Sequence, residues 1–108
     1  MCLVAFAFGV SGDYPMIFAA NRDEHHARPT AAAHWWTESQ HILGGRDLLA
    51  GGTWLAVDQL GRLAAVTNVP SPSGATYTKS RGHLVTDYLA GEVPAPVSYT
   101  HLTLPTLL

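Results

Sequence analysis

Two short stretches hold the residues whose types suit covalent chemistry. Residue 2 is the single cysteine of the chain, and four strongly polar residues follow one another at positions 21–24. Removal of Met1, which is usual when the second residue is small, would leave Cys2 with a thiol and a free α-amine. An α-amine with a pKa of about 7.7–8.0 accepts the proton of a thiol whose pKa is about 8.5. One residue would then carry both the nucleophile and the base that attack on an acyl group requires.

The segments around these residues predict the β-hairpin that positions them. Residues 2–8, "CLVAFAF", are apolar throughout, which indicates a strand covered on both faces. Residues 11–15 contain the Gly, Asp and Pro typical of a turn, and a second apolar run, "MIFAAN", follows. Antiparallel pairing returns the end of the second strand to the start of the first. We therefore expect residues 21–24 to lie beside Cys2.

This proximity gives the polar cluster two interpretations. In the first, Arg22 holds the thiolate and lowers its pKa, while Asp23 accepts a hydrogen bond from the α-amine and orients it. In the second, the charges of residues 22–24 are solvated at the edge of a loop, and Cys2 packs as a small apolar residue. Residue types alone favour the second interpretation.

Composition restricts the class of protein. The chain has 108 residues, of which 47% are hydrophobic, and this size suits one small domain. Charged residues make up 13% and the net charge is -2, so no basic stripe exists for phosphates and we expect no nucleic-acid partner. The apolar residues 3–10 fall short of the roughly 20 that a spanning helix needs, and no basic residue precedes them as in a signal peptide. We predict a cytoplasmic protein without an integral membrane segment.

The middle of the chain predicts a second hairpin after an irregular region. Residues 22–50 contain a proline, an alanine run and paired glycines, so we expect a long excursion with little regular structure. The apolar runs 53–57 and 63–69 are separated by a good turn sequence at 58–61. The two glycines at 51 and 52 indicate a close backbone approach or a bulge before this hairpin.

One amphipathic helix is predicted after a loop at residues 70–79. Ser80 is a suitable N-cap for "RGHLVTDYLAG", and Gly91 supplies a stop. Helical spacing places four apolar side chains on one face: Leu84, Val85, Tyr88 and Leu89.

The last segment differs in character from the rest. Residues 94–108, "PAPVSYTHLTLPTLL", contain no charged residue and do not continue the helix. They resemble adaptor-derived tails found at the ends of assembled reading frames, so we expect a non-native or disordered tail. The predicted domain is therefore residues 1–93, cut short of its native end.

Several motifs, in order and spacing, closely resemble those of the NRDE family, also called the transport and Golgi organisation protein 2 family. They are "ANRDE" after a Met-Cys hairpin, "ARPT", "GGRDLLAGGTWLAV", "GRLAAVTN" and "SRGHLVTDYLAG". The resemblance implies an α+β fold, the N-terminal part of the αββα sandwich of N-terminal nucleophile hydrolases. Strands apolar on both sides and an outer helix agree with it.

The resemblance also implies roles for individual residues. By similarity to cysteine-type enzymes of that superfamily, Cys2 is the nucleophile, Arg22 and Asp23 support it, and Asn68 donates to the oxyanion. A neutral, directional amide N–H suits the oxyanion role. From the residues alone, Asn68 is as well explained as a turn residue at a strand end. The superfamily's further active-site residues come from much later in the chain.

Two functions follow as expectations. The first is hydrolysis of a C–N amide bond through a Cys2 thioester. The alternative is a non-catalytic carrier of haem, lipid or acyl-CoA on the same fold, in which haem is a carried ligand and no cofactor is needed. We expect Asn21, Glu24 and Trp54 to contribute to binding of the small-molecule ligand. His25 and His26 are adjacent and point to opposite sides on extended backbone, so we expect no metal site.

Overall fold

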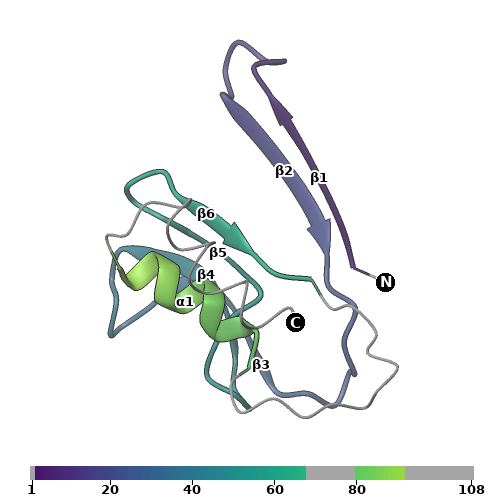
Figure 1. Ribbon diagram of the computed structural model, residues 1–108, viewed down its shortest axis with the longest axis vertical. Coiled ribbons are helices and arrows are strands. Elements are labelled where there is room, and N and C mark those ends of the chain that lie inside the picture. Colours follow the sequence, from purple (N-terminus) through teal and green to yellow (C-terminus); the bar gives the residue numbers. More distant parts are fainter. Residues whose placement is uncertain (1, 68–79, 92–108) are drawn as a thin grey trace, which may run out of the picture.

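The computed structural model describes residues 2–67 and 80–91, and it contains two antiparallel sheets and one helix (Figure 1). Strands β1 (Leu3–Phe8) and β2 (Met16–Asn21) form a two-stranded sheet. The second sheet has four strands in chain order: β3 (Thr30–Trp35), β4 (Ile42–Asp47), β5 (Leu55–Asp58) and β6 (Leu63–Ala65). Helix α1 (Gly82–Ala90) packs against β4, β5 and β6. The predicted α+β class with antiparallel sheets is confirmed, and the arrangement is consistent with part of a sandwich.

The first predicted hairpin is also confirmed. Its register pairs Leu3 with Asn21 and Phe8 with Met16. Gly9 has φ of +67° and donates its N–H to the Pro15 carbonyl at 3.0 Å, so the turn uses a conformation that favours glycine. Pairing over the whole of both strands brings the end of β2 beside the start of β1.

The expectation that this first strand is covered on both faces is wrong. Leu3, Phe6 and Phe8 are between 62% and 65% exposed. In the described part of the chain, neither strand of the hairpin packs against any other element, and Figure 1 shows the hairpin projecting away from the second sheet. The apolar pattern of this strand is typical of a buried strand. No layer in the described part of the chain covers it.

The prediction of little regular structure over residues 22–50 is wrong as well, because β3 and β4 lie there. The register of β3 on β4 shifts between Ala31 and His34, and such a bulge removes the steady period by which a strand is recognised. Gly44 acts as a packing residue in β4. A Cβ at this position would lie 2.8 Å from the Cβ of Ala56 on the neighbouring strand. The glycine thus permits a close approach of backbones within the sheet.

The second predicted hairpin is confirmed, with shorter strands. The β5–β6 turn contains Gly61 at φ of +80°, and the Asp58 carboxylate accepts hydrogen bonds from the backbone of Leu60 and Arg62. Strand β6 ends at Ala65, before the predicted limit of residue 69. Residues 68 and 69 lie outside the described part of the chain.

The predicted helix is confirmed, with its first residue slightly displaced. Arg81 occupies the N-cap position, while the Ser80 hydroxyl accepts a hydrogen bond from the Gly82 N–H at 3.3 Å. Val85 and Leu89 are 1% and 0% exposed. They pack with three residues of the sheet region to form the core: Trp36, Ile42 and Ala56. Gly91 ends the helix in an extended conformation, not the left-handed one that glycine allows.

The C-terminal end of α1 is held by a buried ion pair from the β5–β6 hairpin. Arg62 donates to the fully buried carboxylate of Asp58 at 2.7 Å, and to the carbonyls of Leu89 and Gly91 at 2.9 and 2.7 Å. Those carbonyls have no partner within the helix, and a cation there complements the helix dipole. Burial raises the pKa of Asp58, but hydrogen bonds from Arg62 and its charge outweigh burial and hold that pKa below its usual value.

The start of α1 is held by the close backbone approach that the paired glycines predict. A Cβ on Gly52 would lie 2.6 Å from the carbonyl carbon of Gly82, and Thr53 donates its N–H to the Gly82 oxygen at 3.4 Å. Two glycines thus face each other where the helix begins. This contact sets the first turn of α1 against the segment that leads into β5.

Candidate functional site

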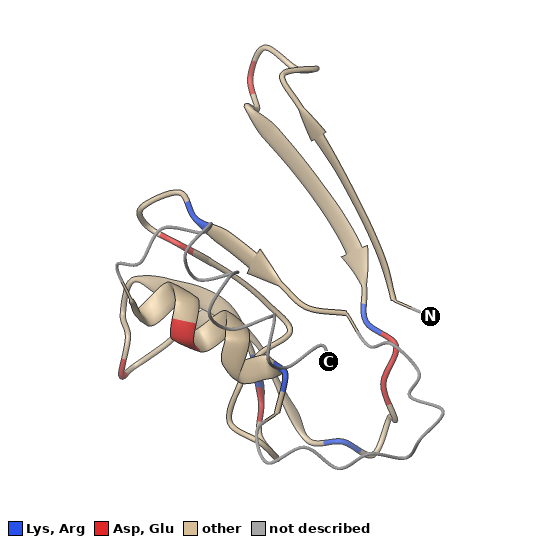
Figure 2. Ribbon diagram, viewed as in Figure 1, with Lys and Arg blue, Asp and Glu red and all other residues tan. Residues whose placement is uncertain are grey.

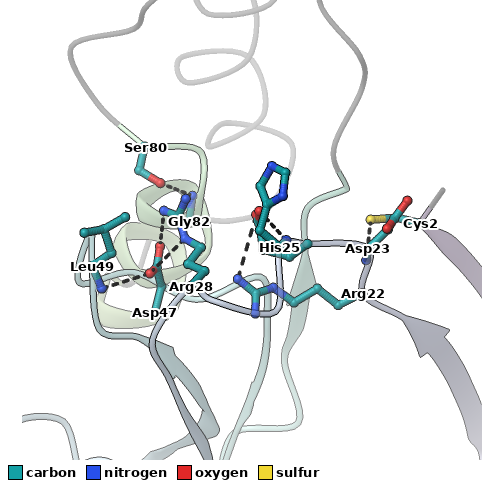
Figure 3. A network of polar contacts seen from close by, with 10 residues as sticks. Cys2, Arg22, Asp23, His25, Arg28, Asp47, Leu49, Ser80 and Gly82 are labelled. Atoms are coloured by element: carbon teal, nitrogen blue, oxygen red, sulfur yellow. Dashed lines mark hydrogen bonds and ion pairs between the residues drawn. The ribbon is translucent and has the colours of Figure 1, made fainter.

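The hairpin brings the chain start and the polar cluster together. The Asp23 N–H donates a hydrogen bond to the sulfur of Cys2 at 3.4 Å (Figure 3). At the paired ends of the two strands, the Leu3 N–H donates to the Asn21 side-chain oxygen at 3.0 Å. Asn21 therefore fastens the end of the hairpin, and the sequence-based expectation of proximity between Cys2 and residues 21–24 is met.

Arg22 turns its guanidinium away from Cys2 (Figure 3) and pairs with Glu24. The Nη2 atom lies 3.9 Å from Glu24 Oε2, and the two side chains are 25% and 20% exposed. The expected interaction of Arg22 with the thiolate is thus not the arrangement seen here, and a role in supporting the nucleophile stays a prediction.

The two carboxylates of the cluster are stabilised as anions by different groups. A hydrogen bond from the amino terminus of the chain, followed by its positive charge, lowers the pKa of Asp23. A hydrogen bond from the His25 N–H, at 2.9 Å, is the main cause that lowers the pKa of Glu24, and the charges of Arg28 and Arg22 add to it. The charge of the chain start thus favours the Asp23 anion, whereas the His25 N–H and two arginines favour the Glu24 anion.

A second ion pair, which the sequence analysis did not identify, fixes this corner to the sheet. Arg28 donates to both oxygens of Asp47, at 3.2 and 2.7 Å. The Arg28 hydrogen bond lowers the pKa of Asp47, against the effect of burial. Asp47 also accepts the Leu49 N–H at 3.0 Å. Arg28 lies in the motif "ARPT" and Asp47 in the motif "GGRDLLAG". The opposite charges of these two motif residues were the signal that could have indicated this ion pair.

These elements enclose an open cavity of about 930 Å³. Four of the candidate site residues line it: Cys2, Arg22, Glu24 and Trp54. Part of the cavity wall comes from the sheet face opposite the helix. Ile42 and Ala56 are buried with α1, and the strand alternation points Leu43, Leu55 and Val57 the other way. The cavity therefore has an apolar wall and a polar end at the hairpin base.

Other candidate residues are placed as follows. Asn21 and Asp23 belong to the polar corner but not to the cavity lining described above. Asn68, the expected oxyanion donor, lies outside the described residues. Within residues 2–67 and 80–91, no group of three or more His, Cys, Asp or Glu side chains gathers in a way that could hold a metal ion. Within those same ranges, no helix has the length and apolarity to cross a membrane.

The motifs have clear counterparts in known proteins. Residues 1–103 match the family described as Transport and Golgi organisation 2. This match extends past residue 93, the predicted domain end, and the origin of the tail stays a prediction. The human Transport and Golgi organization protein 2 homolog is 41% identical over 100 residues, which cover 86% of this chain and 36% of the relative.

Relatives from other organisms agree. The Drosophila melanogaster Transport and Golgi organization protein 2 is 38% identical over 101 residues, 82% of this chain and 35% of that protein. An uncharacterized protein of Saccharomyces cerevisiae is 34% identical over 88 residues, 75% of this chain and 28% of that protein. The chain thus spans about a third of the length of the curated relatives it matches.

Proposed function

This chain belongs to the transport and Golgi organisation 2 family, and from that premise we propose that it carries the nucleophile of a cysteine amidohydrolase, Cys2. The observation that carries the proposal is the hydrogen bond from the Asp23 N–H to the Cys2 sulfur at the rim of the cavity. An N–H donor stabilises a thiolate more than a thiol, so it favours the reactive form. The positive charge of the chain start lowers the pKa of Asp23, and after loss of Met1 this carboxylate is the proposed acceptor that orients the Cys2 amine.

The proposed reaction has two steps. After loss of Met1, the α-amine takes the thiol proton, and the thiolate attacks the amide carbon. The C–N bond breaks, the leaving amine takes the proton from the α-ammonium group, and a Cys2 thioester remains. Water then attacks the thioester, which releases the carboxylic acid and restores the thiol. Asn68 is the proposed donor to the oxyanion formed in each step, and the reaction is proposed for the cytoplasm.

The test begins with the chemistry of the chain start. The intact mass of the purified chain shows whether Met1 is removed, and removal is the expected result. A retained Met1 leaves Cys2 without a free amine and overturns the self-activated mechanism.

Turnover is then measured on a panel of acyl amides. Because the chain spans only part of its relatives, we would use both the chain and a full-length chimera in which residues 1–91 replace the matching segment of the human relative. Cys2→Ala is expected to abolish turnover, at least about a thousandfold, because the thioester cannot form. Cys2→Ser is the matched control that keeps a hydroxyl at the same place. Absence of turnover in the chimera, or equal turnover with Cys2→Ala, counts against the proposal.

The apolar wall of the cavity supports a second candidate, a carrier of haem or of a lipid or acyl-CoA ligand. Leu43, Leu55 and Val57 offer a surface that suits an acyl chain or a haem face. If the protein is a carrier, the Cys2→Ala variant should still bind the ligand although it cleaves no amide. Haem titration of the chimera would show a spectral shift larger than that with an unrelated protein, and the lack of such a shift removes haem as the ligand.

A further inference from the structure

One face of the β1–β2 hairpin is apolar along its whole length. Side chains alternate between the two faces of a strand, so the register places six apolar side chains on the same face: Val4, Phe6, Phe8, Met16, Phe18 and Ala20. Figure 2 shows no charged residue along either strand. We call this surface the aromatic face of the hairpin.

The aromatic face continues into the cavity that Cys2 lines. Phe18 lines this cavity together with Cys2, and so does Arg22, which follows β2 directly. Ile17 and Ala19, on the opposite face of β2, do not line it. Within the described ranges, the hairpin does not pack against the second sheet, although residues of both line the cavity. The space between them is therefore open to a ligand.

The register gives the distance from the sulfur-bearing residue to the aromatic part of the cavity. Leu3 pairs with Asn21, so Cys2 lies one position beyond that pair, where the Asp23 N–H contacts its sulfur at 3.4 Å. Phe18 lies three positions from Asn21 in the other direction. Four strand positions of about 3.3 Å each separate Cys2 from Phe18 by about 13 Å. Ala20 lies between them, and its small, exposed side chain leaves this stretch of the face uncovered.

We propose that the aromatic face binds a straight acyl chain that runs from Cys2 over Ala20 to Phe18, and that Phe18 sets the preferred chain length. The span is close to the length of an extended decanoyl chain, so the ligand class is a linear acyl compound of medium length. The cavity of about 930 Å³ lies within the range of ligand pockets, roughly 300–1,000 Å³. Apolar side chains of the second sheet line the same cavity: Leu43, Leu55 and Val57.

The chain subsite serves both functions considered above. Identification of the acyl compound as a substrate rests on the proposed function, because only a catalytic Cys2 would take up its acyl group. A carrier would use the same subsite without a covalent step. The test must therefore report on the subsite without amide cleavage.

The single cysteine of the chain allows such a test. The 108-residue chain reacts with straight-chain N-alkyl iodoacetamides, from N-methyl to N-dodecyl, and the thiolate displaces iodide to form a C–S bond. Intact mass gives each rate, which is divided by the rate of a short cysteine peptide with the same reagent. We expect the ratio to rise roughly twofold per methylene up to N-hexyl, because each methylene is partly buried. N-hexyl iodoacetamide spans about the length of a decanoyl chain, so longer reagents should gain little more.

A first pair of variants tests the role of Phe18. Phe18→Ala should lower the ratio for N-hexyl iodoacetamide at least threefold and leave the N-methyl ratio unchanged. Ile17→Ala is the matched control, because it removes apolar surface from the opposite face of the same strand. It should retain the wild-type ratios. A change in thiolate reactivity would alter the rates of all reagents by one factor, so it cannot imitate the loss that depends on chain length.

A second pair of variants tests the path over Ala20. Ala20→Phe places a ring between Cys2 and Phe18 and should shift the highest ratio to shorter reagents. Ala19→Phe adds the same ring to the opposite face and should keep the wild-type length profile. Both alanines are exposed in β2, and phenylalanine is favoured in strands, so the hairpin should tolerate either change.

Three results would overturn the subsite. They are a length profile equal to that of the peptide, an equal loss in Ile17→Ala and Phe18→Ala, and an unchanged profile in Ala20→Phe. An equal loss in the first pair would mean that alkyl chains adhere to the hairpin without a preferred face. Because alkylation needs neither amide cleavage nor removal of Met1, the subsite and the proposed function can each fail alone.

Discussion

The strands of the β1–β2 hairpin are more apolar than those of the α1-covered sheet, yet their side chains are less buried. In the sheet, Ile42 and Ala56 lie under Val85 and Leu89, and all four are at most 2% exposed. In the hairpin, large apolar side chains are mostly exposed: Leu3, Phe6, Phe8, Val10 and Ile17. The difference teaches that an apolar strand needs a partner layer, since an isolated hairpin with only its own backbone hydrogen bonds is marginal in water.

The same difference bears on the candidate site. Cys2 and Asp23 stand on the exposed hairpin, whereas Arg28 and Asp47 connect the following segment to the sheet. The proposed nucleophile, Cys2, thus lies on the less well-packed region, and the Arg28–Asp47 ion pair joins the next segment to the better-packed one. The sandwich implied by the family resemblance would cover the exposed faces and hold Cys2 more firmly.

The largest expected effect is in the sheet and helix. Leu89→Ala removes a side chain that is 0% exposed and should lower the free energy of unfolding by about 3 kcal/mol. The matched control, Leu49→Ala, alters a side chain that is 68% exposed and should cost less than about 0.5 kcal/mol. Urea unfolding of the 108-residue chain measures both. Equal losses would show that the core does not lie where the structure places it.

An intermediate effect is expected at the buried ion pair. Asp58→Asn should lower the free energy of unfolding by about 2 kcal/mol at pH 7, because Arg62 loses its charged partner. The pKa of Asp58 is lower in the folded state than the value of 3.8 for an unperturbed group. Its stabilisation is therefore complete above about pH 3.8 and is lost as the pH falls through the lower folded value.

Unfolding followed from pH 7 to pH 2 checks this sign. The difference in the free energy of unfolding between the wild-type chain and Asp58→Asn should decrease only below about pH 4. Asp13→Asn, in the exposed hairpin turn, is the control and should show no such gap. A gap that stays constant down to the lowest pH would mean that the carboxylate charge contributes nothing.

The smallest effect is expected in the hairpin. Phe8, which is 64% exposed, lies beside Phe6 at a ring-centroid distance of 5.4 Å. Phe8→Ser should change the free energy of unfolding of the 108-residue chain by less than about 0.5 kcal/mol. A loss above about 1 kcal/mol would show that the hairpin is packed in solution, and the contrast between the two regions would then disappear.

The elements that could be predicted are those bounded by residues typical of turns and helix ends. Gly9 and Pro15 flank one turn, Asp58 and Gly61 lie in another, and Ser80 and Gly91 bracket the helix. Strands β3 and β4 could not be predicted, because the bulge after Ala31 and the packing role of Gly44 obscure their pattern. Their pairing depends on neighbours that are distant in sequence.

The contacts of the candidate site likewise fall into those that the sequence predicts and those that it does not. Sequence by itself determined that Cys2 and residues 21–24 share one end of a hairpin, because antiparallel register follows from the length of its strands and turn. Only the tertiary structure decided that Arg22 faces Glu24, that Arg28 pairs with Asp47, and that the arginines converge on one cavity. These contacts join different elements, and their geometry is set by how the sheet, the helix and the connecting segment pack together.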